Sequence, residues 1–317
     1  METAIHSRLA RFPVTFFTMI MGLSGFTLSL AKAEEVLGWS SNASSVSLAI
    51  TTGLFVLVTV AYLLKILQQW EAVRDEWSDP IRVAFFPAFS ISLLLLAVAF
   101  YPNSVMFAEA VWLVGAVLQL LLTVGVVTSW IGARSFQHGH LTPAWFVPVV
   151  GNVIAPIGGV MLGYVEFSWF LYAIGLMFWI VLLAIVINRL IFHDPIPERL
   201  QPTLVVLIAP PAIGFLGWTS LNEGLDPFAR ILINVGYFFC LVVMVQLPAL
   251  SRLQFSMTFW ALSFPLAAIT TASLRFAELS GSAFHSTIGF GLLGVLVVIL
   301  TWLVVRTVQS VWRGEVF

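Results

Sequence analysis

The chain has 317 residues, of which 60% are hydrophobic and only 9% are charged, and its formal net charge is −1. Soluble domains carry about 25% charged residues, so this composition excludes a soluble globular protein and predicts a polytopic membrane protein. The small net charge gives no indication of a nucleic-acid partner. We expect residues 1–317 to form a single integral membrane domain, because the polar connections are too short to hold a separate one.

Apolar runs divide the chain into ten predicted membrane-spanning helices, each near the roughly 20 residues that a spanning helix needs. The fold class is therefore all-α. In chain order the segments cover residues 14–31, 47–67, 83–100, 105–130, 144–164, 168–192, 202–221, 226–250, 256–276 and 284–312.

Proline separates the odd-numbered segments from the even-numbered ones. All five odd segments contain proline, whereas four of the five even segments contain none. Proline inside a helix removes a backbone hydrogen bond and kinks the axis. Since lipid cannot satisfy the freed carbonyl, such helices belong against protein or beside an aqueous cavity. We therefore expect five helical hairpins, with the odd helices inside and lining a central path. The predicted kink sites are Pro13, Pro87, Pro148, Pro156, Pro210, Pro211 and Pro265.

The odd segments are also richer in hydroxyl and amide side chains, and phenylalanine recurs beside their prolines. For any one of these residues, packing between helices is at least as good an interpretation as pore lining. No ionisable residue lies near the middle of a predicted span, which argues against a proton-driven pump and favours a passive conduit. The pore-lining candidates are Phe16, Phe86, Phe146, Phe215, Ser263 and Asn152.

Motifs for catalysis or metal binding are missing from the sequence. His138-Gly-His140 has a ligand-like spacing, but its turn holds no carboxylate or cysteine, so we expect two solvated histidines. There is no Ser/His/Asp arrangement and no phosphate-binding glycine loop. The sequence therefore predicts neither an enzyme nor a metal site, and it implies no cofactor. The single cysteine, Cys240, excludes an intrachain disulfide.

Basic residues indicate the orientation. With the N-terminus in the cytoplasm, 11 of the 14 Lys and Arg residues lie inside, and only Lys32, Arg230 and Arg275 lie outside. This asymmetry predicts a multi-pass protein of the cell (inner) membrane with both termini cytoplasmic. The connection from Lys65 to Arg82 mixes both signs, and we expect a solvated extension of the second helix there.

Several motifs together resemble the tellurite-resistance/dicarboxylate transporter family, which includes the plant guard-cell slow anion channels and their bacterial relatives. The resemblance extends from about Phe12 to Trp312, and the ninth-segment motif is its most specific part. The motifs are Arg11-Phe-Pro, Gly22-Leu, Phe85-Phe-Pro-Ala-Phe-Ser, Phe146-Val-Pro-Val-Val-Gly-Asn152, Ala209-Pro-Pro-Ala and Trp260-Ala-Leu-Ser-Phe264-Pro-Leu.

This resemblance implies ten helices in five hairpins with quasi-fivefold symmetry, a pore lined by the odd helices, and a homotrimer with one pore per subunit. It also implies an anion conduit occluded by a phenylalanine of the ninth helix. Matching Ser-Phe-Pro to Ser263-Phe264-Pro265 assigns this gate to Phe264. From residue type alone, packing between helices would be the better interpretation of Phe264, because aromatic residues dominate cores.

Three functional hypotheses follow. The favoured one is a passive channel for small monovalent anions such as chloride and nitrate. The alternative is a secondary carrier for dicarboxylates or tellurite-like oxyanions, and the third is a membrane scaffold without transport. The expected partners are small inorganic or organic anions and the lipid bilayer. Arg230 and Arg275 are candidate contributors to anion preference, although contact with lipid headgroups or outer-loop water is the better interpretation of each.

Overall fold

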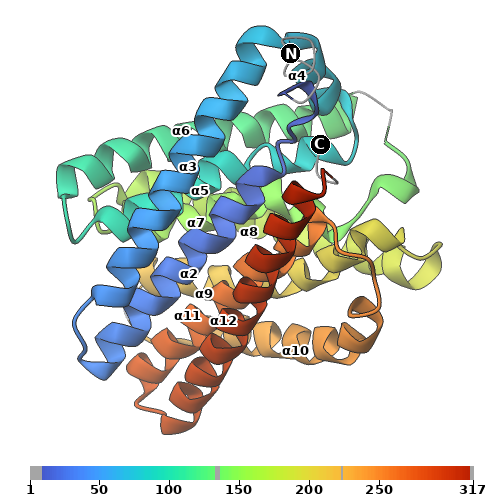
Figure 1. Ribbon diagram of the computed structural model, residues 1–317. Helices are drawn as coiled ribbons and strands as arrows, with labels where there is room; N and C mark the ends of the chain where they lie inside the picture. Colours follow the sequence, from blue (N-terminus) through green and yellow to red (C-terminus); the bar gives the residue numbers. More distant parts are fainter. Residues whose placement is uncertain (1–8, 133–135, 223, 315–317) are drawn as a thin grey trace.

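The computed structural model describes residues 9–132, 136–222 and 224–314. Within these residues, nine helical stretches are long and apolar enough to cross a membrane, and a tenth, Pro143–Gly159, is shorter. The expected all-α polytopic membrane fold is confirmed (Figure 1). The fifth expected segment, 144–164, is overlong, because its helix ends at Gly159 and the chain turns at Gly163, where φ is +86°.

The helices fall into two sets that differ in burial. In each stretch we consider an apolar segment of 18 residues. In four stretches 61–78% of these residues are buried, whereas in the five others only 22–33% are buried. The more buried stretches contain α2 (Phe16–Leu37), α5 (Ala88–Phe100), α9 (Ala209–Leu221) and α11 (Ser263–Ser280). The shorter α7 (Val147–Gly159) belongs with them, because every residue in it except Ile157 is buried.

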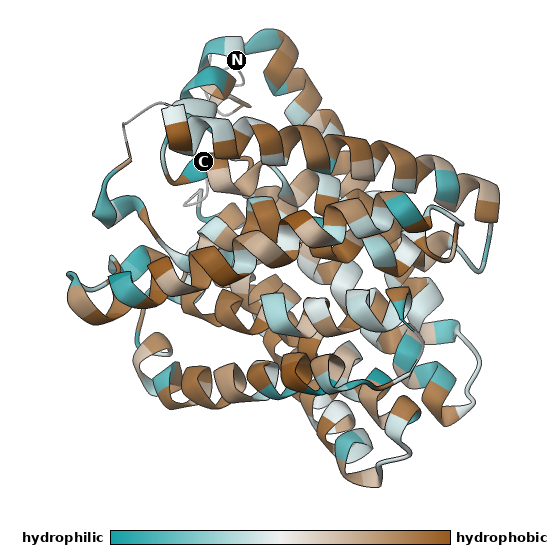
Figure 2. Cartoon of the chain, turned by 180° about the vertical axis from the view of Figure 1, so that it is seen from behind, coloured by the Kyte–Doolittle hydropathy of each residue, from teal (hydrophilic) through white to brown (hydrophobic). Residues whose placement is uncertain are grey.

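The less buried set forms the outside of the molecule. It consists of α3 (Asn42–Gln68), α6 (Val105–Gly132), α8 (Val165–Phe192), α10 (Pro227–Leu250) and α12 (Ala283–Trp312). These helices expose large apolar side chains, and Figure 2 shows brown along the long helices with teal gathered mainly at helix ends and loops. Exposed apolar surface of this extent suits a lipid environment.

The contacts between helices define a ring. Each inner helix packs against the outer helix that follows it in the chain, from α2 with α3 to α11 with α12. The inner helices also contact one another in the order α2, α5, α7, α9, α11 and back to α2. The start of α2 and the end of α12 lie at the same face of the molecule (Figure 1), which we call the termini face, and the opposite one the far face.

Four inner helices begin with a 3₁₀ segment at the termini face. These segments are η1 (Arg82–Phe85), η3 (Pro143–Phe146), η4 (Glu198–Ile208) and η5 (Met257–Leu262).

The prolines lie mostly where these 3₁₀ segments join the α-helices. Pro87 directly precedes α5, and Pro148, Pro210, Pro211 and Pro265 occupy the second or third residue of their helices. At such positions the missing N–H leaves no helical bond unmade. Most of the expected mid-helix kinks are therefore changes of helix type at a helix start. Of the other two, Pro13 precedes α2 and Pro156 lies inside α7.

The connection after α3 corrects another expectation. α3 ends at Gln68, and a separate short helix, α4 (Trp70–Ser78), folds back at Gln69. Lys65 and Glu76 form an ion pair of 2.8 Å with side chains only 1% and 3% exposed. The solvated extension that we expected was therefore wrong at these two residues, because α4 covers them.

Candidate functional site

A narrow cavity lies inside the ring of inner helices, toward the termini face. Its walls come from all five inner helices and their 3₁₀ segments. Its volume is only about 30 Å³. None of the residues that line it is charged. The hydroxyl groups of two lining residues, Thr18 and Thr203, each donate to a carbonyl of their own backbone, at 2.6 Å in both cases. The cavity is therefore small and apolar.

A wider cavity lies on the other side of the ring interior and reaches the far face. Its volume is about 630 Å³, and its walls again come from all five inner helices. Leu28, Leu95, Ile157, Leu216 and Ala268 are among them. The ring therefore encloses two cavities of very different volume.

Phe264 borders both spaces. In the described part of the chain it is the one residue that lines both the narrow and the wide cavity, and its side chain is only 5% exposed. On the α2 side, a Cβ atom added to Gly25 would lie 3.2 Å from Phe264 Cδ2. The phenyl ring therefore lies close against α2 at Gly25, a position that has no side chain.

The residues around Phe264 explain why its backbone is held in place. Ser263 donates a hydrogen bond to the Trp260 carbonyl at 2.6 Å, across the junction of η5 and α11. Trp260 in turn donates from its indole to Thr307 Oγ1 of α12 at 2.9 Å. The junction that carries Phe264 is thus closed by a local hydrogen bond and anchored to α12 through Trp260.

A third space opens at the termini face. This vestibule, of about 1000 Å³, is lined by residues at the starts of four inner helices, including Pro13, Arg82, Arg199 and Arg252. The segment η1 borders both spaces, since Arg82 lines the vestibule and Phe85 lines the narrow cavity. The vestibule and the narrow cavity therefore lie on the side of the termini face, and the wide cavity lies on the side of the far face.

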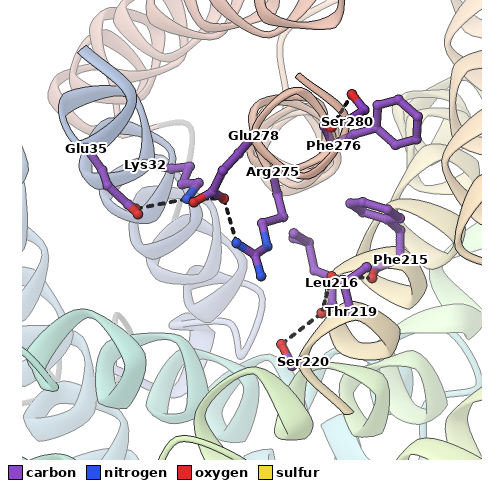
Figure 3. Close-up of polar contacts among 10 residues, drawn as sticks. All are labelled: Lys32, Glu35, Phe215, Leu216, Thr219, Ser220, Arg275, Phe276, Glu278 and Ser280. Carbon is purple, nitrogen blue, oxygen red and sulfur yellow. Dashed lines mark hydrogen bonds and ion pairs between the residues drawn. The ribbon is translucent and has the colours of Figure 1, made fainter. Parts of the chain in front are cut away.

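Charged side chains border the wide cavity at the far face (Figure 3). Lys32 Nζ lies 3.0 Å from Glu35 Oε2 and 2.7 Å from Glu278 Oε2, and Arg275 Nη1 lies 2.5 Å from the same Glu278 oxygen. Figure 3 shows Arg275 extending from α11 toward Ser220 of α9. Two cations thus share one carboxylate at this mouth.

The two arginines singled out in the sequence have different surroundings. Arg275 lines the wide cavity, whereas the guanidinium of Arg230 lies over the Phe276 ring, 5.7 Å from its centroid. Arg230 is not among the residues that border the three spaces.

Among the pore-lining candidates, the structure brings Phe146 to the narrow cavity, where it joins Phe264. Phe86 packs edge-on against Tyr62 and Trp77 instead. Phe215 is fully buried beside Phe276.

The other three candidates also pack against protein. Phe16 stacks on Phe12 with 4.6 Å between ring centroids. Asn152 donates to Thr123 Oγ1 at 2.8 Å, and Ser263 donates to a backbone carbonyl. The contact of Asn152 joins α7 to α6, the other two are local, and none of these residues lines any of the three spaces.

Sequence reasoning missed several residues at the two mouths. The pairing of Lys32 with Glu278 joins positions at opposite ends of the chain and leaves no local pattern. The vestibule arginines do have a signal, because Arg82, Arg199 and Arg252 each lie shortly before an odd-numbered apolar segment. The imidazole rings of His138 and His193 also stack, with 4.7 Å between their centroids, a contact that the sequence did not indicate.

A ring of apolar helices around internal cavities defines a polytopic membrane protein. Residues 11–308 match the SLAC1 family, described as voltage-dependent anion channel, and the chain belongs to this family. The resemblance drawn from the sequence motifs is thereby confirmed.

Similar proteins include plant anion channels and prokaryotic proteins. The S-type anion channel SLAH2 of Arabidopsis thaliana is 29% identical over 278 residues, which cover 85% of this chain and 53% of SLAH2. An uncharacterized transporter of Methanocaldococcus jannaschii is 22% identical over 99% of this chain and 98% of its own length. The tellurite resistance protein TehA homolog of Haemophilus influenzae is 23% identical over 96% of this chain and 92% of its own length. The chain thus spans about half the length of three of the matched plant channels.

Proposed function

We propose that the protein is a passive channel for small monovalent anions, with one path through the ring of inner helices and Phe264 as its gate. The observation that carries the proposal is the place of Phe264 between the narrow and the wide cavity. Membership of an anion channel family supports the choice of anions.

The physical basis of the gate is dehydration. An ion that enters the narrow cavity meets apolar walls and hydroxyls already bonded to their own helices. Hydrophobic constrictions exclude water, and ions do not pass where water is excluded. Because a barrier lowered by about 1.4 kcal/mol raises a rate about tenfold, loss of the phenyl ring is expected to raise the conductance at least about tenfold.

The test is Phe264→Ala in purified protein, reconstituted into planar bilayers with an anion gradient. We expect a large rise in anion conductance in a protein that remains folded. Phe215→Ala is the matched control, because Phe215 is fully buried and lines none of the three spaces. It is expected to cost about 3–5 kcal/mol of stability without opening a path. A well-folded Phe264→Ala protein that conducts no better than wild type would contradict the gate.

Weak selectivity is part of the same proposal. The narrow cavity has no charged ring, so ions should be ranked by their ease of dehydration, with nitrate passing at least as well as chloride. Reversal potentials with nitrate on one side and chloride on the other measure this order. Strict preference for chloride, permeation by potassium, or saturable counterflow typical of a carrier would each contradict the channel.

We propose further that the termini face is cytoplasmic in the cell (inner) membrane and that three copies assemble, each with its own path. The excess of basic residues in connections at the termini face supports the orientation. The trimer rests on the resemblance to the family. Native mass measurement of the detergent-solubilised protein tests it, and a monomer or a dimer would contradict it.

A further inference from the structure

The two mouths of the ring differ in how their basic residues are paired. At the far face, Lys32 contacts both Glu35 and Glu278, and Arg275 contacts Glu278. Two cations therefore face two carboxylates, and their charges cancel within one cluster. An anion that approaches the wide cavity meets little net charge from these four residues.

The vestibule at the termini face has a different balance. Arg82, Arg199 and Arg252 line it together with one carboxylate, Glu198. Arg82 has an acidic neighbour, Asp79, at 3.8 Å. In the described ranges, no carboxylate lies within 4.0 Å of the basic groups of Arg199 and Arg252. Both side chains are exposed, so their charge acts on the solution in the vestibule.

We propose that Arg199 and Arg252 form a collecting site for small anions, so that anions pass more readily from the termini face to the far face than in reverse. The inference rests on the proposed anion conduction and adds a direction to it. It requires no tight binding, because unpaired charge around a vestibule raises the local concentration of counter-ions.

Because the narrow cavity is uncharged, the charge of Arg199 and Arg252 can affect the rate at which anions pass. When the throat itself does not attract ions, the rate of passage depends on the anion concentration at its entrance. A potential of one kT at the vestibule raises the local concentration of a monovalent anion about threefold. Because Arg199 and Arg252 are exposed, salt must weaken the effect: the Debye length falls from about 30 Å at 0.01 M to about 3 Å at 1 M.

The experiment uses the full-length Phe264→Ala protein in planar bilayers with identical chloride solutions on both sides. The ratio of currents at equal and opposite voltages measures the asymmetry. Gln254 lines the vestibule, so a Gln254→Cys, Cys240→Ser background reports orientation. An impermeant thiol reagent alters the current only from the vestibule side. We expect anion flux from the termini face to be about threefold larger at low salt and the ratio to approach one at high salt.

Charge variants separate this site from general surface charge. Arg199→Gln with Arg252→Gln should abolish the asymmetry, Arg252→Lys should preserve it, and Glu198→Gln should enlarge it. Arg74→Gln is the control, since Arg74 is an exposed arginine on α4 that does not line the vestibule.

The outcomes distinguish the two proposals. Absence of current in the Phe264→Ala protein would overturn the proposed function and this inference with it. A current that is symmetric at low salt, or an asymmetry that survives the double arginine change, would overturn only the collecting site.

Discussion

Gly22 of α2 faces Ser263 of α11 so closely that a Cβ atom added to Gly22 would fall 1.9 Å from Ser263 Oγ. One turn further along α2, a Cβ atom on Gly25 would lie 3.2 Å from the Phe264 ring. The two glycines thus bring α2 against the start of α11, where the candidate gate lies. The position of Phe264 depends on this close approach as much as on its own residue type.

Gly22→Ala is therefore expected to destabilise the protein. The added methyl group must displace Ser263, and overpacking of this kind costs about 1–3 kcal/mol. Thermal unfolding of the purified protein in detergent measures the loss. Gly53→Ala on α3 is the matched control, because nothing lies within 4 Å of the added Cβ. If the two variants unfolded at the same temperature, the close contact between α2 and α11 would be in doubt.

The buried pair of Lys65 and Glu76 predicts a second stability effect. Lys65 Nζ also donates to the Phe12 carbonyl at 2.8 Å, so the pair ties α3 and α4 to the segment before α2. Lys65→Met leaves Glu76 buried without its cation and is expected to cost about 3–5 kcal/mol. Thermal unfolding of the purified variants measures this cost. Lys65→Met combined with Glu76→Met should cost less than the single change, and the opposite order would contradict a paired, buried charge.

Glu278 is expected to limit the admission of anions from the far face. Glu278→Gln removes the carboxylate that Lys32 and Arg275 share, so the two cations would act on the wide cavity. In the Phe264→Ala background, anion flux from the far face at low salt should rise about threefold, the effect of one kT of potential. Arg275→Gln should lower it.

Glu109→Gln is the control for that change. Glu109 accepts a hydrogen bond from Tyr164 and does not line the wide cavity, although it carries the same charge. Equal currents from the Glu278 and Glu109 variants would contradict a specific effect of Glu278 on anion entry from the far face.

Orientation can be tested with single cysteines in a Cys240→Ser background. Ser41 and Asn103 are exposed in connections at the far face, and Gln137 and Gln254 are exposed at the termini face. In intact cells, cysteines at the first pair should react with an impermeant thiol reagent and those at the second pair should not. Labelling of the second pair instead would reverse the orientation.

Composition and proline spacing were sufficient to predict the class of fold. An excess of apolar residues over ten spans leaves few structures other than membrane helices. Proline is tolerated in a span where protein covers the affected backbone, and the proline-rich segments are the ones that the structure buries most. These rules act locally, so one sequence reveals them.

The candidate site depended on contacts between distant parts of the chain. Only the tertiary structure placed Phe264 between two cavities, turned Phe86 and Phe215 toward other aromatic rings, and joined Lys32 to Glu278. A helix presents side chains in every direction, and the sequence shows only which residues are apolar or charged. Which of them faces the axis is decided by the packing of neighbouring helices, and that packing depends on close approaches such as the one at Gly22.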